Sequence, residues 1–94
     1  MIVRIVKLTL QPEKTEDFLA LFNHYKKEIS SFPGCLYLQG LQNTESPNIF
    51  FTYSHWDSKE SLNNYRNSPL FNEVWPQART WFKEKPEAWS SKIL

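Results

Sequence analysis

One stretch decides the fold of this chain: Thr52-Tyr-Ser-His-Trp-Asp-Ser-Lys-Glu-Ser-Leu-Asn-Asn-Tyr-Arg-Asn-Ser-Pro-Leu-Phe-Asn-Glu-Val-Trp75. It begins as the end of an aromatic strand, Ile49–Trp56, in which successive side chains point to opposite faces. Asp57 is a suitable N-cap residue, and Glu60 three residues later completes a pattern like a capping box. The stretch therefore predicts a strand that turns at Asp57 into a helix running through Arg66.

A second helical segment is predicted directly after the first. Ser68 reads as a fresh N-cap, followed by Pro69 at the first helical position, where proline is well tolerated. Pro76 lies inside this segment and is expected to kink or split it, because it removes the backbone hydrogen bond to Asn72. Lys85-Pro86 ends the helix.

The rest of the chain supplies one more helix and three more strands. The helix carries an apolar stripe at helical spacing and is stopped by Pro33-Gly34. A polar loop at residues 43–48 is short enough to join two strands as a hairpin. The predicted elements are a strand at Ile2–Leu10, a helix at Thr15–Phe32, and strands at Cys35–Gln42, Ile49–Trp56 and Ala88–Leu94.

The order of elements is β-α-β-β-α-β, within one domain that spans residues 1–94. A right-handed crossover with the third strand between the first two gives a four-stranded antiparallel α+β sheet. The helices can cover only one face, yet the first and third strands are apolar on both. We therefore expect a homodimer in which two sheets pack face to face around a barrel-like core.

Composition excludes several classes of partner. Eleven basic and ten acidic residues leave a net charge of +1 without a basic stripe, so no nucleic-acid partner is expected. No apolar run approaches the roughly 20 residues that cross a bilayer, so no membrane partner is expected. The single cysteine, Cys35, excludes an internal disulfide and fits a reducing, cytoplasmic location. A small buried side chain is the favoured interpretation of Cys35 over a reactive thiol.

The usual catalytic signatures are missing from the sequence. His24 and His55 are the only histidines and have no further ligand at metal spacing, so no metal site is expected. Gly34 and Gly40 are too few for a phosphate-binding loop. His55 is a weak candidate for a catalytic base, and a structural histidine is the favoured alternative.

Strand alternation places Thr52 and Trp56 on one face and His55 on the other. If the first face meets the helices, it can line a cavity that is closed by Tyr65, Phe71 and Trp75. Such a cavity suits a flat apolar ligand. The alternative, favoured on the residues alone, is that these rings fill the space between sheet and helix.

A longer pattern then carries a family resemblance: Tyr53-Ser-x-Trp56-x-Ser-x-x-x-Leu62-x-x-Tyr65-Arg66-x-Ser68-x-Leu70-Phe71-x-x-x-Trp75. With Ile2-Val-Arg-Ile-Val-Lys and Phe32-Pro-Gly-Cys35, it resembles the antibiotic biosynthesis monooxygenase (ABM) family over almost the whole chain. The resemblance implies a ferredoxin-like fold, assembled into a dimeric α+β barrel. That fold agrees with the one predicted from the element order.

Two enzymatic branches of this superfamily place different residues at the site. The cofactor-independent polyketide monooxygenases use Asn, Trp and Tyr where this chain has Thr52, Trp56 and Leu62, so only the tryptophan matches. The heme-degrading branch uses Asn, Trp and an axial histidine, and the resemblance sets Val6, Tyr65 and Trp75 of this chain at these three positions. Without the histidine there is no donor for iron, so heme degradation is disfavoured.

Two functions remain open. The first is a cofactor-independent monooxygenase or related oxidoreductase for a small aromatic or quinol-type compound, in which Thr52, Trp56, Tyr65, Phe71 and Trp75 hold the ring. Trp56 and His55 are then weak catalytic candidates. The second is a non-catalytic dimeric module that binds a small hydrophobic ligand in the same pocket. An acid–base residue on the pocket face would separate the two, and the sequence does not visibly supply one.

Overall fold

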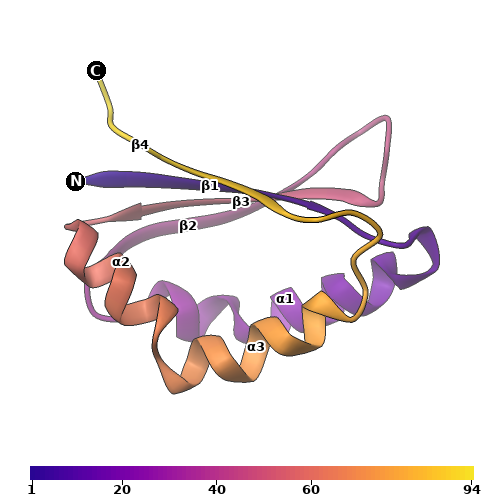
Figure 1. The fold of residues 1–94 in the computed structure, drawn as a ribbon, viewed down its shortest axis with the longest axis horizontal. Helices are drawn as coiled ribbons and strands as arrows, with labels where there is room; N and C mark the ends of the chain where they lie inside the picture. Colours follow the sequence, from indigo (N-terminus) through magenta and orange to yellow (C-terminus); the bar gives the residue numbers. More distant parts are fainter.

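A four-stranded antiparallel sheet forms one layer of the molecule, and the helices form a second layer on one of its faces (Figure 1). The computed structural model describes residues 1–94. The elements are β1 (Ile2–Thr9), η1 (Pro12–Lys14), α1 (Thr15–Ser30), β2 (Cys35–Gln42), β3 (Ile49–Trp56), α2 (Lys59–Arg66), α3 (Pro69–Arg79) and β4 (Glu87–Ser91). The strand order is β2-β3-β1-β4, so β3 lies between β1 and β2 as predicted. The α+β, ferredoxin-like fold class is confirmed.

Strand β3 alternates strictly between a buried and a half-buried face. Phe50, Thr52, Ser54 and Trp56 are buried, whereas the intervening side chains are only partly covered. The buried set faces the helices, because it packs with residues of α1, α2 and α3 in the core clusters and the cavity. The predicted division of this strand into two faces is therefore confirmed.

The N-cap of α2 differs from the prediction. Helix α2 begins at Lys59, and its N-cap is Ser58, whose Oγ accepts a hydrogen bond from the backbone N–H of Ser61. Asp57 instead accepts a hydrogen bond from the Ser58 hydroxyl at 3.2 Å. The prediction of Asp57 and Glu60 as a capping box was wrong by one residue, because Ser58 already supplies the side-chain oxygen that a cap needs.

The two helical segments after β3 separate at Asn67 and not at Pro76. Ser68 caps α3 as predicted, with its Oγ accepting from the backbone N–H of Phe71 at 3.1 Å. Helix α3 then continues through Pro76 to Arg79. Of the two outcomes expected for Pro76, a kink or a split, the split was wrong, because the loss of the one hydrogen bond to Asn72 does not end the helix.

Several element ends differ by a few residues from the prediction. Helix α1 ends at Ser30 instead of Phe32, because residues 31–34, which include Pro33 and Gly34, form a turn. Strand β1 ends at Thr9, and Leu10 forms only an isolated bridge to Phe82. Strand β4 covers Glu87–Ser91 instead of reaching Leu94. Ends are where local patterns are weakest.

Strand β2 contains an irregularity at its start. Cys35 pairs with Trp56 while Tyr37 pairs with His55, so the register shifts around Leu36. A bulge of this kind places two residues opposite one and changes which side chains face the core. Leu36 is left 58% exposed.

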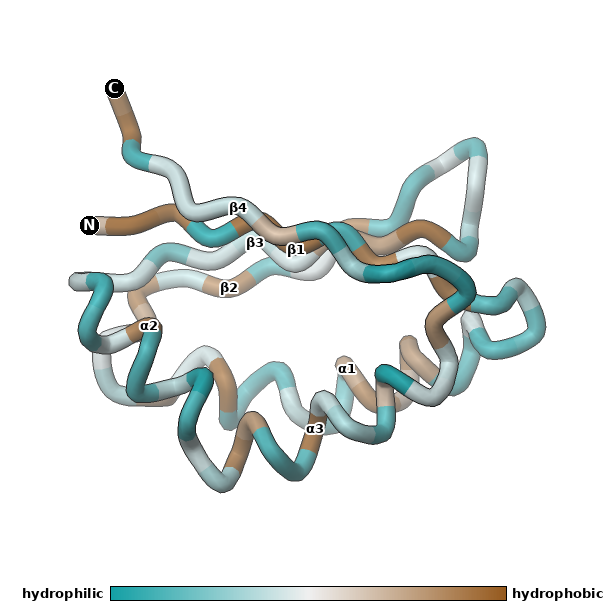
Figure 2. Tube along the Cα trace, viewed as in Figure 1, coloured by the Kyte–Doolittle hydropathy of each residue, from teal (hydrophilic) through white to brown (hydrophobic).

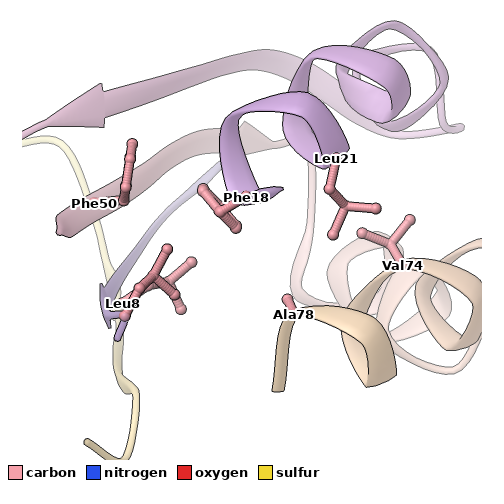
Figure 3. Packing of buried hydrophobic residues seen from close by; sticks show 7 residues of the cluster. Leu8, Phe18, Leu21, Phe50, Val74 and Ala78 are labelled. Atoms are coloured by element: carbon pink, nitrogen blue, oxygen red, sulfur yellow. The ribbon is translucent and has the colours of Figure 1, made fainter. Parts of the chain in front are cut away.

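The buried residues form two separate clusters between the layers. The larger cluster joins β1 and β3 to α1 and α3, and Figure 3 shows Leu21 of α1 facing Val74 of α3, with Phe18 on the side of Phe50 and Leu8. The smaller cluster consists of Ile29, Trp56, Leu62 and Tyr65. Apolar segments recur at intervals along α1 and α3 in Figure 2, as expected for helices with one buried face.

The opposite face of the sheet has no helix over it (Figure 1). Cross-strand pairing sets Ile5 between Tyr53 on β3 and Trp89 on β4, and Tyr53 lies opposite Gln39 on β2. Trp89 is 46% exposed. This outer face is therefore a partly apolar surface that the chain itself leaves uncovered. None of the helices combines the length and the apolar character needed to span a bilayer.

Gly34 is required where the chain leaves the turn after α1. Its φ is +90°, and a Cβ at this position would collide with the side chain of Ser61 and approach Asp57 Oδ1 to 2.9 Å. We expect Gly34→Ala to lower the free energy of unfolding by about 1–3 kcal/mol, the usual cost of a strained left-handed residue. Urea denaturation checks this.

The double variant Gly34→Ala, Ser61→Gly is the matched control. It removes the collision with Ser61 but keeps the positive φ and the approach to Asp57 Oδ1, so it should recover only part of the stability lost in Gly34→Ala. A Gly34→Ala protein as stable as the wild type would contradict the role of this glycine.

Candidate functional site

A cavity of about 180 Å³ lies between the sheet and the helices. Residues of both buried clusters line it, so the cavity lies between the two clusters. Of the 21 residues that line it, 15 are hydrophobic. The 21 lining residues include all five that were predicted to hold a ligand: Thr52, Trp56, Tyr65, Phe71 and Trp75. The space between sheet and helix is therefore only partly filled by side chains.

The volume limits what the cavity can hold. An engineered apolar cavity of roughly 150 Å³ in another protein binds benzene, so about 180 Å³ is room for a single aromatic ring with small substituents. Pockets for drug-sized ligands are typically about 300 Å³ or more. A compound with three fused rings would have to extend through the opening into solvent.

Four aromatic side chains of the site form a continuous series of ring contacts. Trp56 and Tyr65 stack with centroids 5.1 Å apart and an interplanar angle of 24°. Phe71 meets Tyr65 edge-on at 5.3 Å and lies 5.8 Å from Trp75. Contacts of this geometry are favourable beyond the burial of area alone and fix the orientation of each ring.

The hydroxyl group of Tyr65 is held in place by a hydrogen bond within the chain. The indole N–H of Trp75 donates a hydrogen bond to the Tyr65 hydroxyl oxygen at 3.0 Å. The hydroxyl hydrogen of Tyr65 has no acceptor within the chain, so it is free to donate to a ligand. Burial raises the pKa of Tyr65 to about 12, which keeps the phenol protonated at any physiological pH. Tyr65 can therefore act as a fixed hydrogen-bond donor.

Trp56 occupies a different role from Tyr65. It is 1% exposed, and its indole N–H donates to Ser54 Oγ at 3.0 Å. Its only polar hydrogen is thus used inside the chain, and the ring serves as a wall. Ser54 and Thr52 lie beside it on the same face of β3 and give the cavity two hydroxyl groups.

Positive charge gathers at the cavity without negative charge to balance it. Arg4, Arg66 and Arg79 belong to its lining, and no Asp or Glu does. Histidine, lysine and cysteine are also missing from the lining. The only titratable side chains at the cavity are therefore three guanidinium groups and the phenol of Tyr65.

His55 is placed outside this cavity. It lies on the outer face of the sheet, where its Nε2 is 2.9 Å from the hydroxyl oxygen of Tyr53 and its ring is 5.5 Å from that of Tyr37. The structure does not bring His55 to the other predicted site residues of its own chain. Burial raises the pKa of the Cys35 thiol, the opposite of what an activated nucleophile needs. No three His, Cys, Asp or Glu side chains are grouped so that they could hold a metal ion.

Comparison with known proteins gives a family. The model of the antibiotic biosynthesis monooxygenase family matches residues 1–75. The chain belongs to this family. An uncharacterized protein of Synechocystis is 26% identical over 66 residues, which are 70% of this chain and 45% of that protein. The chain thus spans less than half the length of this curated relative.

Solved structures support the same fold. A conserved protein from Methanosarcina mazei superposes with a TM-score of 0.90 at 25% identity, covering 98% of this chain and 92% of its own. A structure named as an antibiotic biosynthesis monooxygenase superposes with a TM-score of 0.94 at 16% identity, covering 100% of this chain and 99% of its own. At such identity the second likeness speaks for the fold alone.

The ABM membership sharpens the comparison at the three positions of the polyketide branch. Thr52, Trp56 and Leu62, the residues that the resemblance sets against the site of that branch, all line the cavity. Leu62 lacks the phenol expected of that branch. Tyr65, three residues further along α2, brings a phenol into the same cavity.

Sequence patterns missed the arginines. Arg4 lies on the same face of β1 as Val6 and Leu8, two side chains that line the cavity from an inward-facing row. Because alternate residues of a strand share a face, the sequence could have indicated that Arg4 points inward with Val6 and Leu8. Arg66 and Arg79 carried no such signal, since arginine in the last turn of a helix is common.

Proposed function

We propose that this ABM protein is a cofactor-independent monooxygenase that acts on a small aromatic, quinol-type compound. The observation that supports this most is the Tyr65 phenol, held by Trp75 in an aromatic cavity with its own hydrogen free. A donor fixed in advance stabilises negative charge that develops on a substrate oxygen, and it does so most strongly where water is excluded. Family membership supports the same reaction class.

In the proposed reaction the substrate itself reduces oxygen. A hydroquinone loses a proton through the opening to water and becomes an electron-rich phenolate, whose oxygen accepts a hydrogen bond from Tyr65. The phenolate reduces O₂, one oxygen atom forms a new bond to the ring, and the other leaves as water with two hydrogens. Hydroquinone and O₂ thus give hydroxyquinone and water. Thr52 and Ser54 can donate to a second ring oxygen.

Tyr65→Phe provides the test. We expect it to lower kcat/KM for oxygen consumption about ten- to a hundredfold, the range for losing one hydrogen bond to a charged oxygen. A hydroquinone panel in an oxygen electrode measures the rate, corrected for oxidation without protein. Mass spectrometry with labelled O₂ should find one labelled oxygen atom in the product.

The matched control is Tyr53→Phe, which removes a phenol from the outer face of β3. It should leave kcat/KM within about twofold of wild type, whereas Thr52→Ala and Trp56→Phe should reduce it. Equal rates for Tyr65→Phe and Tyr53→Phe would contradict the assigned role of Tyr65.

A non-catalytic module that binds a small hydrophobic ligand is the second candidate function. The observation that favours it is the cavity lining, which contains no histidine, carboxylate, lysine or thiol to act as a general base. Binding of hydroquinones without turnover across the panel would decide for this module and against the monooxygenase.

We further propose that the protein is a homodimer joined through the outer faces of its sheets. The support is the row of Ile5, Tyr53 and Trp89, which no element of the chain covers. Exposed apolar patches on small domains commonly mark interaction sites. Two-fold symmetric packing of identical sheets would cover both copies of this row at once.

A further inference from the structure

Arg4 stands out because it is a cation in the inward-facing row of β1. Its cross-strand partners are Ser54 on β3 and Ser90 on β4. Arg4 Nη1 donates a hydrogen bond to Ser90 Oγ at 3.0 Å, which holds the guanidinium in place from one side. An arginine has five N–H donors, so most of its hydrogen-bonding capacity remains for another partner.

Arg66 contributes a second positive charge to the same region. Arg4 and Arg66 both belong to the cavity lining, and the pKa of Arg4 is lowered first by burial and then by the charge of Arg66. The two groups thus repel each other when the cavity is empty. The last turn of α2 suits a cation, which accounts for Arg66 but not for Arg4.

No acidic residue of the chain neutralises these arginines. The ion pairs in the structure are Lys7 with Glu87 and Lys14 with Asp17, and neither involves an arginine. The lining of the cavity likewise contains no carboxylate. Arg4 is partly removed from water without a counter-charge, which is unfavourable, whereas Arg66 is exposed. An anionic ligand would remove the repulsion between the two arginines and would offset the cost of burying Arg4.

We propose that the cavity binds an aromatic carboxylate, with the ring against the Trp56–Tyr65 stack and the carboxylate between Arg4 and Arg66. This inference rests on the ligand-binding cavity of the proposed function and names the chemical class of its ligand. A carboxylate matches the planar fork of arginine, which can form two parallel hydrogen bonds with it. The volume of the cavity limits the ligand to a single aromatic ring.

The carboxylate also fixes the orientation of the bound ligand. Arg4 and Arg66 hold the acidic group, and the aromatic series holds the ring. Anchoring one end of a flat ring in this manner fixes which of its atoms face the Tyr65 hydroxyl. A neutral ring of the same size would lack this constraint and bind more weakly.

The test uses benzoate and its neutral analogue benzamide. Binding is followed by NMR through the indole N–H signals of Trp56 and Trp75, which report from the cavity walls. The wild-type protein should bind benzoate at least about tenfold more tightly than benzamide, the ratio expected for a charged hydrogen bond. Arg4→Gln and Arg66→Gln should each weaken benzoate binding about tenfold or more and leave benzamide binding within about twofold.

Lys59→Gln is the matched control, because it removes the same charge from an exposed position of α2 outside the cavity. It should not change either affinity. Arg4→Lys keeps the charge but lacks the fork, so its affinity for benzoate should lie between those of wild type and Arg4→Gln. A well-dispersed NMR spectrum for each variant shows that it is folded.

Three results would overturn the inference. Equal binding of benzoate and benzamide would remove the need for an anion while leaving the proposed function intact. Unchanged benzoate binding in both arginine variants would place the anion elsewhere. Tighter binding of phenyl phosphate than of benzoate, with the same dependence on Arg4, would replace the carboxylate with a phosphate ester. If neither these compounds nor the hydroquinones bind, the proposed function fails as well.

Discussion

Replacing Trp56 by alanine should lower the free energy of unfolding by about 3–5 kcal/mol, the range observed when a large buried ring is truncated. Trp56 is 1% exposed, stacks on Tyr65, and donates its indole hydrogen to Ser54. The variant loses the packed ring and leaves the Ser54 hydroxyl without its donor. Chemical denaturation followed by circular dichroism measures the change.

The expected loss is a large fraction of the total free energy of unfolding of a domain of this size. A domain of 94 residues is typically stable by about 5–14 kcal/mol, at roughly 0.05–0.15 kcal/mol per residue. If the wild-type stability lies at the low end of this range, Trp56→Ala should be close to unfolding at room temperature. Trp56→Phe keeps most of the ring and should cost less than half as much. A loss below about 1 kcal/mol for Trp56→Ala would show that Trp56 is not the centre of the smaller buried cluster.

Replacing Ile5 by glutamate should convert the proposed dimer into a monomer. Ile5 lies in the middle of the outer face of the sheet, paired with Tyr53 on one side and Trp89 on the other. In a sheet-to-sheet dimer the glutamate would be buried against its own copy, which costs several kcal/mol for an unpaired charge. Light scattering should report twice 11.2 kDa for the wild type and 11.2 kDa for Ile5→Glu.

Ala20→Glu is the control for the added charge. Ala20 is exposed on α1, in the helical layer away from the outer face of the sheet. This variant should keep the wild-type mass. A wild-type protein that is monomeric at micromolar concentration would contradict the proposed dimer, and so would an Ile5→Glu protein that remains folded and dimeric.

The fold could be read from the sequence because its determinants are local. The period of two in Ile49–Trp56, the polar loop at residues 43–48 and the Ser68 cap each act over a few residues, and each was predicted correctly. Their order then leaves few topologies for the sheet. The bulge at Leu36 was missed, since one extra residue in a strand changes the register without altering the apolar pattern.

The candidate site could be predicted only in part. Alternation along β3 and helical spacing indicated which aromatic residues face inward, and those residues do line one cavity. The same patterns gave no means of telling an open cavity from a filled one. That difference depends on how far the two helical segments stand from the sheet, and the distance is set by the packing of every side chain between them.

The sequence by itself determined the order of the elements, the inward face of β3 and the membership in the ABM family, because these depend on short patterns. The tertiary structure alone decided which polar groups meet. The hydrogen bond from Trp75 to Tyr65 joins two helices across the break at Ser68. Arg4 lies in β1 near the N-terminus and Arg66 in the last turn of α2, yet both line one cavity. Contacts between residues so far apart follow from the packing of the layers, which no local pattern of residues encodes.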